Sequence, residues 1–417
     1  MTTWTTPADI RAETERLWTR GLVLACVLSK LARRDALDSG VTNEDDAPTS
    51  QSRVAFPYRL RLRRPAASEL GSSFEAVRTW VRSLEAASRP ETGVGFEIEW
   101  EDVNTRQLGR NRLPAALILP TLDDALAAIG RSADADRFGE LAAATFTRFP
   151  ELAGWIARKQ LVLLEHHADW QRILDILAWF PAHPRSGLYA RQIDVPGVDT
   201  KFIEARKVLL GELLDLVLPA DAVEHSALGA HQFEVRYGLA AKPVLVRFRL
   251  LDPTLAIAGL TDLSVPASEF AKLDITASRA FIVENEVTGL AFPELPDSIL
   301  IFGGGYSIDR LATAQWLCSR TVVYWGDIDT HGCAILDRLR ALFPQTNSLL
   351  MDRETLLTHR AQWSFEATPQ TADLHGLDTK ERALYDDIRF DRLGSGVRLE
   401  QERIPFSYMC SAIRTHQ

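Results

Sequence analysis

Three short apolar runs in the last third of the chain are each followed by residues whose types and spacing favour chemistry. The runs cover residues 280–283, 298–302 and 321–325. The sets that follow them are Glu284 and Glu286, then Gly303, Gly304 and Gly305, and then Asp327, Asp329 and His331. Such runs are typical of strands buried on both faces of a parallel sheet. Because functional groups collect at the carboxyl ends of these strands, we expect the three sets to converge on one crevice.

The carboxylates Glu284, Asp327 and Asp329 predict a site for hard divalent cations. Clustered carboxylates repel one another, and Mg²⁺ or Mn²⁺ relieves that repulsion because these ions prefer oxygen ligands. Asp327 and Asp329 are two residues apart, so on an extended segment their side chains point the same way. Taken alone, Asp-x-Asp is also common helix-capping chemistry and a triple glycine is also a tight loop. Their joint occurrence after strands favours the metal site.

The elements that position these groups divide the chain into three predicted domains. Residues 1–190 predict an α+β domain with a long helical part, 136–180. Turn-rich clusters at 181–187 and 196–200 mark its end. An amphipathic helix at 201–218 and strand-like runs at 233–237 and 244–250 have the order of a winged-helix module, predicted for 191–275. Residues 276–417 predict an α/β domain, so the fold class is multidomain α+β and α/β.

Composition sets the class of protein. The 417 residues include 47 basic and 56 acidic side chains, and the net charge of −9 argues against nonspecific coating of nucleic acid. The 4 cysteines have no paired spacing, which favours reduced thiols in a cytoplasmic protein over disulfides or a zinc site. We find no apolar stretch of membrane-spanning length and expect no membrane association.

These motifs resemble those of a known family, the nuclease subunit of Wadjet-type anti-plasmid systems, called the JetD family. The second half resembles the Toprim fold of topoisomerases, primases and related nucleases. The resemblance covers nearly the whole chain and is carried by five segments: 189–204, 283–286, 301–305, 325–332 and 398–404.

The resemblance implies an arm domain, a winged-helix (CAP-like) domain and a C-terminal Toprim domain. It implies a homodimer that works with a condensin-like SMC ATPase and its kleisin and kite subunits, and that cleaves closed circular double-stranded plasmid DNA. Glu284, Asp327 and Asp329 are then the ligands of Mg²⁺ or Mn²⁺. Type IIB topoisomerases, whose A subunits are related, place a nucleophilic tyrosine on the winged helix. Tyr237 is the only tyrosine in 191–275 and has no motif around it, so we expect hydrolysis without a covalent intermediate.

Further residues are candidates, each with a structural alternative. Glu286 either faces the crevice or begins a helix, and His331 either assists at the phosphate or is a loop residue. Glu402 is either a metal ligand or an ion-pair partner of a neighbouring arginine. The candidates for DNA binding are Lys201, Arg206 and Lys207 on the predicted winged-helix entry helix, together with Gly303, Gly304 and Gly305.

Two other functions remain open. The first is a non-catalytic architectural subunit that binds DNA, although such a module has no need of clustered carboxylates. The second is a Toprim topoisomerase or primase, although no motif places a nucleophilic tyrosine and no nucleotide-binding signature is present. The acidic net charge also predicts that the isolated protein binds DNA poorly and depends on a partner to deliver it.

Overall fold

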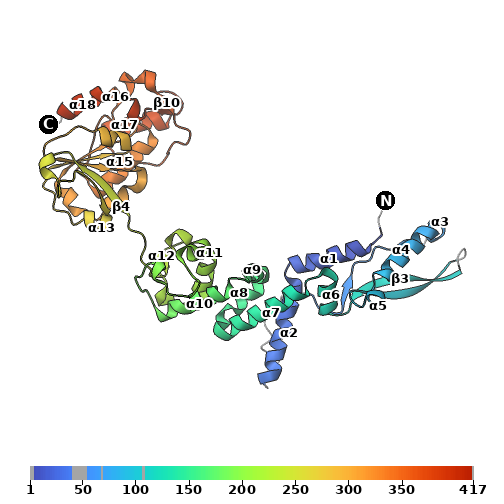
Figure 1. Cartoon of the computed structure of the whole chain (residues 1–417). Coiled ribbons are helices and arrows are strands. Elements are labelled where there is room, and N and C mark those ends of the chain that lie inside the picture. Colours follow the sequence, from blue (N-terminus) through green and yellow to red (C-terminus); the bar gives the residue numbers. More distant parts are fainter. Residues whose placement is uncertain (1–3, 40–53, 67–68, 106–108, 416–417) are drawn as a thin grey trace. The chain divides into compact units, whose positions relative to one another are not determined.

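The computed structural model describes residues 4–39, 54–66, 69–105 and 109–415 (Figure 1). The chain divides into two units, Met1–Ala241 and Lys242–Gln417. Among the described helices, none has the length and the apolar character needed to cross a membrane.

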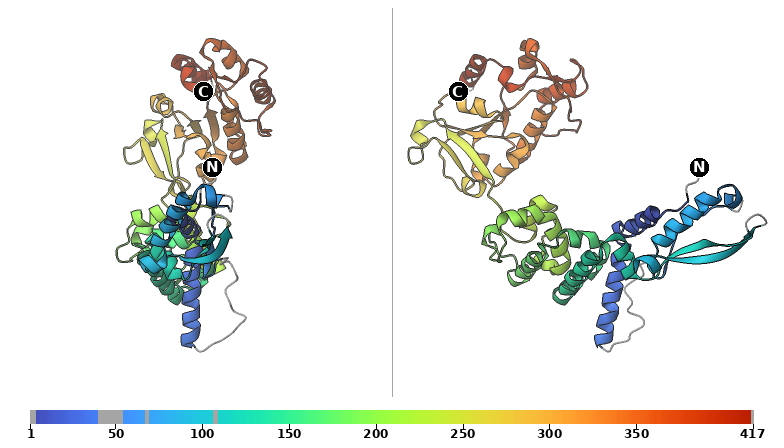
Figure 2. Two further views of the ribbon diagram at one scale, coloured as in Figure 1. Left: turned by 90° about the vertical axis from the view of Figure 1, so that its right-hand side faces the viewer. Right: turned by 45° about the vertical axis from the view of Figure 1, so that its right-hand side comes forward.

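The first part of unit 1 is a three-stranded antiparallel sheet packed against helix α4 (Phe74–Ala86). Its strand order is β1 (Tyr58–Leu60), β3 (Gly109–Leu119) and β2 (Glu97–Thr105). Trp80 and Leu84, on the apolar face of α4, are buried together with Leu117 of β3. The β2–β3 hairpin extends past the short β1, as Figure 2 shows.

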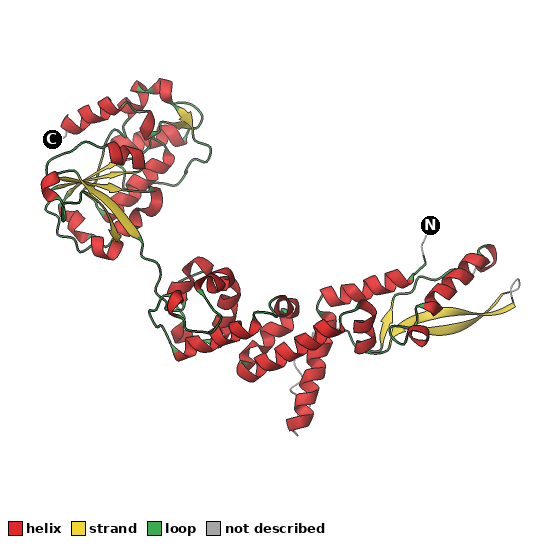
Figure 3. Cartoon of the chain, viewed as in Figure 1, coloured by secondary structure: helices red, strands yellow, loops and turns green. Residues whose placement is uncertain are grey.

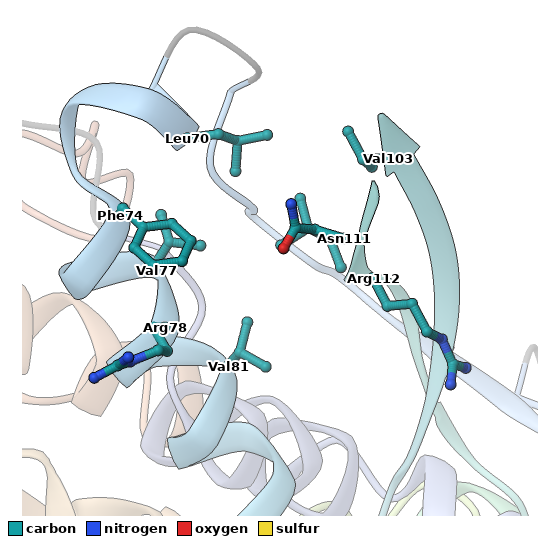
Figure 4. Close-up of a pocket in the computed structure, with 9 residues that line it drawn as sticks. Leu70, Phe74, Val77, Arg78, Val81, Val103, Asn111 and Arg112 are labelled. Carbon is teal, nitrogen blue, oxygen red and sulfur yellow. The ribbon is translucent and has the colours of Figure 1, made fainter. Parts of the chain in front are cut away.

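An apolar cleft of about 190 Å³ lies between α3–α4 and this hairpin (Figure 4). Leu70 of α3 (Glu69–Ser72) and Val77 of α4 face Val103 of β2 across it. Arg78 and Arg112 also line the cleft, and the guanidinium of Arg112 lies 5.3 Å from the ring centre of Trp100.

The rest of unit 1 is helical (Figure 3). Its longer helices are α1 (Pro7–Thr19), α2 (Leu22–Ser39), α6 (Leu122–Ile129), α7 (Ser132–Arg148), α10 (Trp170–Ala182) and α11 (Thr200–Val217). The shorter ones are α5 (Arg89–Thr92), α8 (Ala153–Arg158), α9 (Gln160–Glu165) and α12 (Phe233–Arg236). One apolar core runs from Leu17 through Leu174 and Leu210 to Leu239, and so it continues across the boundary predicted at residue 190.

The prediction of a strand at 233–237, and with it a hairpin with 244–250 as in a winged helix, is wrong. Residues 233–236 form helix α12, and Phe233 packs edge-to-face against Tyr237 with ring centres 4.8 Å apart, a contact that the spacing of four residues allows on a helix. The second run is strand β4 (Leu245–Leu250), which pairs with β5 (Asp262–Pro266) and β7 (Ser298–Phe302) of unit 2. The structure therefore divides the chain at residue 241, whereas the predicted domain boundary at 275 falls inside unit 2.

Unit 2 contains the expected α/β sheet. The strand order is β5-β4-β7-β6-β8-β9, with β6 (Arg279–Val283), β8 (Thr321–Trp325) and β9 (Asn347–Ser348). The pairs β7-β6, β6-β8 and β8-β9 are parallel, whereas β4 and β5 run antiparallel at one edge. The helices of this unit are α13 (Ala267–Phe270), α14 (Glu286–Ala291), α15 (Thr330–Leu342), α16 (Arg353–Thr358), α17 (Thr379–Arg389) and α18 (Phe406–Thr415). All three apolar runs are confirmed as strands. The runs in β6 and β7 are buried at every residue, whereas in β8 Thr321 is exposed and Val323 is half-buried.

Candidate active site at the strand ends of unit 2

Strand β6 is the topological switch point of the sheet. It pairs with β7 on one side and β8 on the other, and Val283 lies in register with both Phe302 and Trp325. The residue that follows each strand therefore starts at the same level of the sheet edge. Ligand sites of open α/β sheets form at such points, and the expected convergence of the three motifs is present in the structure.

Glu284 follows β6 and is held by its neighbours from β8. Its Oε1 accepts a hydrogen bond from the hydroxyl of Tyr324, a fully buried residue of β8. Burial raises the pKa of Glu284 to about 7, and the charges of Asp327 and Asp329 add to the rise. A Cβ at Gly326 would collide with both Glu284 and Tyr324, so only glycine leaves room for the carboxylate here.

Asp329 is the N-cap of α15. Its Oδ1 accepts a hydrogen bond from the backbone N of Gly332 at 2.7 Å, and the residue is 4% exposed. Burial raises the pKa of Asp329 to about 6, and the charges of Glu366 and Asp327 raise it further. The capping alternative for the Asp-x-Asp motif is therefore real, and it fixes this carboxylate beside Asp327.

Asp327 is bound by a segment from the far end of the sequence. Its Oδ1 accepts from the backbone N of Gln401 at 2.8 Å, and its Oδ2 pairs with Arg398. Backbone hydrogen bonds of 2.9 and 3.0 Å between Ile328 and Leu399 join the two segments. Residues 398–401 of the 398–404 motif therefore belong to the site.

Sequence reasoning missed two charged residues that flank Asp329. Both lie on the small antiparallel pair of β10 (Ser364–Phe365) and β11 (Val397–Arg398) or directly after it. Arg398 places its Nε 2.9 Å from Oδ2 of Asp329. The buried Glu366 accepts hydrogen bonds from the hydroxyl and backbone N of Thr330 at 2.5 and 3.2 Å. The motif 398–404 was a signal for Arg398, whereas nothing in the spacing marked Glu366.

The three carboxylates fit a divalent cation by their chemistry. Oxygen donors are what Mg²⁺ and Mn²⁺ prefer. Burial, and then the charges of neighbouring carboxylates, raise the pKa of Glu284 and of Asp329, and a bound cation favours the charged forms of both groups. Among the described residues, no group of three His, Cys, Asp or Glu side chains is already arranged to hold a metal ion. The guanidinium of Arg398 pairs with Asp327 and Asp329 instead.

The structure pairs Glu286 with Arg247, and it places Nε2 of His331 3.9 Å from Oε1 of Glu366. Glu286, the first residue of α14, is exposed and pairs with Arg247 of β4 at 2.5 Å. The Nε2 of His331 lies 2.9 Å from the carbonyl oxygen of Thr368. Glu402 is exposed and accepts from the side-chain amide of Asn285, next to Glu284. It therefore lies at the rim of the site, and its role as a metal ligand stays a prediction.

The glycine loop after β7 lies tight against β6. The backbone N of Gly303 donates to the carbonyl oxygen of Val283 at 2.7 Å, and Gly304 and Gly305 both have a φ of +63°. Arg310 donates to the carbonyl oxygen of Gly303 at 2.9 Å and holds the loop from behind. The position of the glycine loop next to Glu284 is consistent with close approach of a phosphate backbone. DNA binding by this loop stays a prediction.

The three basic DNA-binding candidates lie on α11 of unit 1. Lys201 is exposed. Arg206 pairs with Asp169, and Lys207 pairs with Glu234 at 2.7 Å, so these two side chains already stabilise unit 1. Of the three, Lys201 is the one whose exposure suits a phosphate contact.

We expect the metal-free protein to lose stability as the pH rises. The pKa of Glu284 is about 7 in the folded chain against 4.5 in a free glutamate, and that of Asp329 is about 6 against 3.8. Because the folded state binds these protons more tightly, their stabilisation is complete below about pH 4 and is lost as the pH rises through 6 to 7. In EDTA, the thermal midpoint of the wild type should fall more between pH 5 and 8 than that of Glu284→Gln. If the thermal midpoints of the two proteins fell equally, the raised pKa of Glu284 would be contradicted.

Two family models match the chain. Residues 238–413 match the model of the C-terminal domain of Wadjet protein JetD. Residues 7–215 match an N-terminal family of uncharacterised proteins conserved in bacteria (DUF3322). No curated protein sequence matches the chain. The two matched ranges cover both structural units, and the chain belongs to the Wadjet JetD family.

Proposed function

We propose that this protein is the metal-dependent DNA endonuclease of an SMC (condensin-like) anti-plasmid complex, and that it hydrolyses closed circular plasmid DNA. The observation that carries the proposal is the convergence of Glu284, Asp327 and Asp329 at the switch point of a parallel sheet. Burial raises the pKa of Glu284 and of Asp329, so both carboxylates favour binding a proton or a cation.

The residues of the site have separable roles in this proposal. Glu284, Asp327 and Asp329 hold Mg²⁺ or Mn²⁺, and a bound ion of this kind stabilises the attacking and leaving oxygens of a phosphodiester. Tyr324 orients Glu284 by its hydrogen bond, and the cap of α15 orients Asp329. The loop Gly303–Gly305 gives the DNA backbone access at the same edge of the sheet.

The position of Tyr237 favours hydrolysis over a mechanism with a covalent protein–DNA intermediate. Tyr237 is 2% exposed, and its hydroxyl lies 2.7 Å from Asp215. Burial raises the pKa of this hydroxyl, and the hydrogen bond with Asp215 adds to the rise. A buried, neutral phenol is a poor nucleophile. Tyr237 therefore does not suit the nucleophilic attack on DNA that the topoisomerase alternative requires.

The proposed partners follow from family membership and charge. Wadjet systems are the setting of the JetD family, and we propose that the SMC ATPase with its kleisin and kite subunits presents the plasmid to a homodimer of this chain. The net charge of −9 supports delivery by a partner, because DNA affinity comes largely from cationic contacts with phosphates. The architectural alternative predicts the same partners but no requirement for the carboxylates.

The test is cleavage of closed circular plasmid by the purified protein, alone and with the loop-extruding ATPase, in Mg²⁺ and in Mn²⁺. We expect linear product that depends on the metal and on the ATPase, with ends that carry no attached protein after denaturation. Gel electrophoresis separates circular, nicked and linear forms. Intact plasmid in the complete mixture would favour the architectural function, and protein-linked ends would favour a topoisomerase.

A further inference from the structure

The geometry around Arg398 points to a role beyond an ion pair. We propose that Arg398 is a further catalytic residue, which binds the phosphate under attack once a metal ion has taken its place at Asp327 and Asp329. This inference rests on the proposed nuclease function and names a residue that the three-carboxylate motif leaves out.

Arg398 now occupies the position of a cation between the two aspartates. Its Nη2 pairs with Asp327 and its Nε lies 2.9 Å from Asp329. Its charge lowers the pKa of Glu284 as well as that of Asp329, against the larger effect of burial. One guanidinium therefore partly neutralises the whole carboxylate cluster. Divalent cations at these carboxylates compete with it directly.

The backbone around Arg398 is anchored at the site, so only the side chain of Arg398 can move. Leu399, the next residue, exchanges two backbone hydrogen bonds with Ile328, which lies between the two aspartates in the chain. The side-chain amide of Gln401 also donates to the carbonyl oxygen of Trp325 at 2.9 Å. A guanidinium released by the aspartates can therefore only swing about this anchored segment, and it stays at the strand ends.

The side chain of Arg398 is partly open to solvent. It is 32% exposed, and its Nη1 lies 3.6 Å from Oε1 of Glu400, longer than a hydrogen bond. Arginine binds phosphate oxygens through two parallel hydrogen bonds, and it stabilises the charge that develops on a phosphoryl group under attack. A partly exposed side chain held at these carboxylates suits this role.

The first measurement is Mn²⁺ binding to the full-length protein without DNA, by titration calorimetry. If Arg398 competes with the ion, Arg398→Gln should bind Mn²⁺ about tenfold more tightly than the wild type, since a charge-assisted pair is removed. If Arg398 only holds the aspartates in place, the same variant should bind Mn²⁺ more weakly. That weaker binding would overturn the proposal.

The second measurement is plasmid cleavage with the ATPase at saturating Mn²⁺. We expect Arg398→Gln to cut at least about a hundredfold more slowly although its metal site is full, because one preorganised donor to the phosphate is lost. Arg398→Lys keeps the charge without the paired donors and should bind Mn²⁺ as the wild type does, yet cut more slowly. This second variant keeps the test decisive if Arg398→Gln does not fold.

Arg403→Gln is the matched control. Arg403 lies in the same segment, and its ion-pair partner at 2.8 Å is Glu400 rather than either aspartate. It should keep wild-type metal binding and cleavage. If the wild type binds Mn²⁺ and cuts but Arg398→Gln cuts equally well, only the role of Arg398 is lost. If the wild type neither binds Mn²⁺ nor cuts delivered plasmid, the nuclease proposal itself fails, and this inference fails with it.

Discussion

Glu284→Gln is expected to reduce plasmid cleavage by at least about a thousandfold, because losing a metal ligand removes several kcal/mol of transition-state stabilisation. Glutamine has almost the same shape, and its amide oxygen still accepts the hydrogen bond from Tyr324, so the fold should remain. It lacks the negative charge that the site contributes to a cation. The measurement is the rate of plasmid linearisation with the ATPase, together with Mn²⁺ affinity by calorimetry.

Glu286→Gln is the matched control for this prediction. Glu286 is two residues away in the chain, but it is exposed and pairs with Arg247. Exposed ion pairs contribute at most about 1 kcal/mol, so this variant should cut at nearly the wild-type rate. A wild-type rate for Glu284→Gln would contradict the metal-dependent mechanism, and a large loss in Glu286→Gln would return that residue to the site.

Gly326→Ala is expected to reduce both stability and cleavage. The added Cβ would collide with Glu284 and with Tyr324, whose ring is buried and unable to move aside. Overpacking of this kind costs about 1–3 kcal/mol of unfolding free energy. A displacement of Glu284 by about 1 Å is enough to reduce the rate about a hundredfold. Chemical denaturation and the plasmid assay measure the two effects.

Gly139→Ala is the control for the Gly326 substitution. Gly139 lies within α7, and a Cβ there would meet Val27 at an ordinary 3.7 Å. Alanine favours the helix over glycine by about 1 kcal/mol, so this variant should be slightly more stable and fully active. If Gly326→Ala behaved like Gly139→Ala, the close packing around Glu284 would not matter for function.

The pattern of apolar residues along the chain predicted the strands that carry the site. The runs 280–283, 298–302 and 321–325 are apolar at every or nearly every position, and that pattern is that of a strand covered on both faces. Parallel strands align their carboxyl ends, so Glu284 and Asp327 had to meet. The helix at 201–218 was equally readable from its spacing and is α11.

Local pattern was misleading where a short segment suits both a helix and a strand. Residues 233–237 contain aromatic and β-branched residues that favour strands, yet tertiary packing places Phe233 and Tyr237 on one face of a helix. The strand at 244–250 is confirmed as β4, and it pairs with β5, the next strand along the chain, and with β7 about fifty residues later. The pairing with β7 is a long-range contact, which the local pattern does not predict.

By itself the sequence determined the central strands of unit 2, the carboxylates that follow two of them and the acidic charge of the chain. Only the tertiary structure decided which further charges reach those carboxylates. Arg398 lies 71 residues after Asp327, and Glu366 lies 36 residues after Thr330. Periodicity describes neighbours on one element, whereas these contacts depend on how β10 and β11 fold back over the sheet edge. The cationic part of the site is therefore a property of the folded chain.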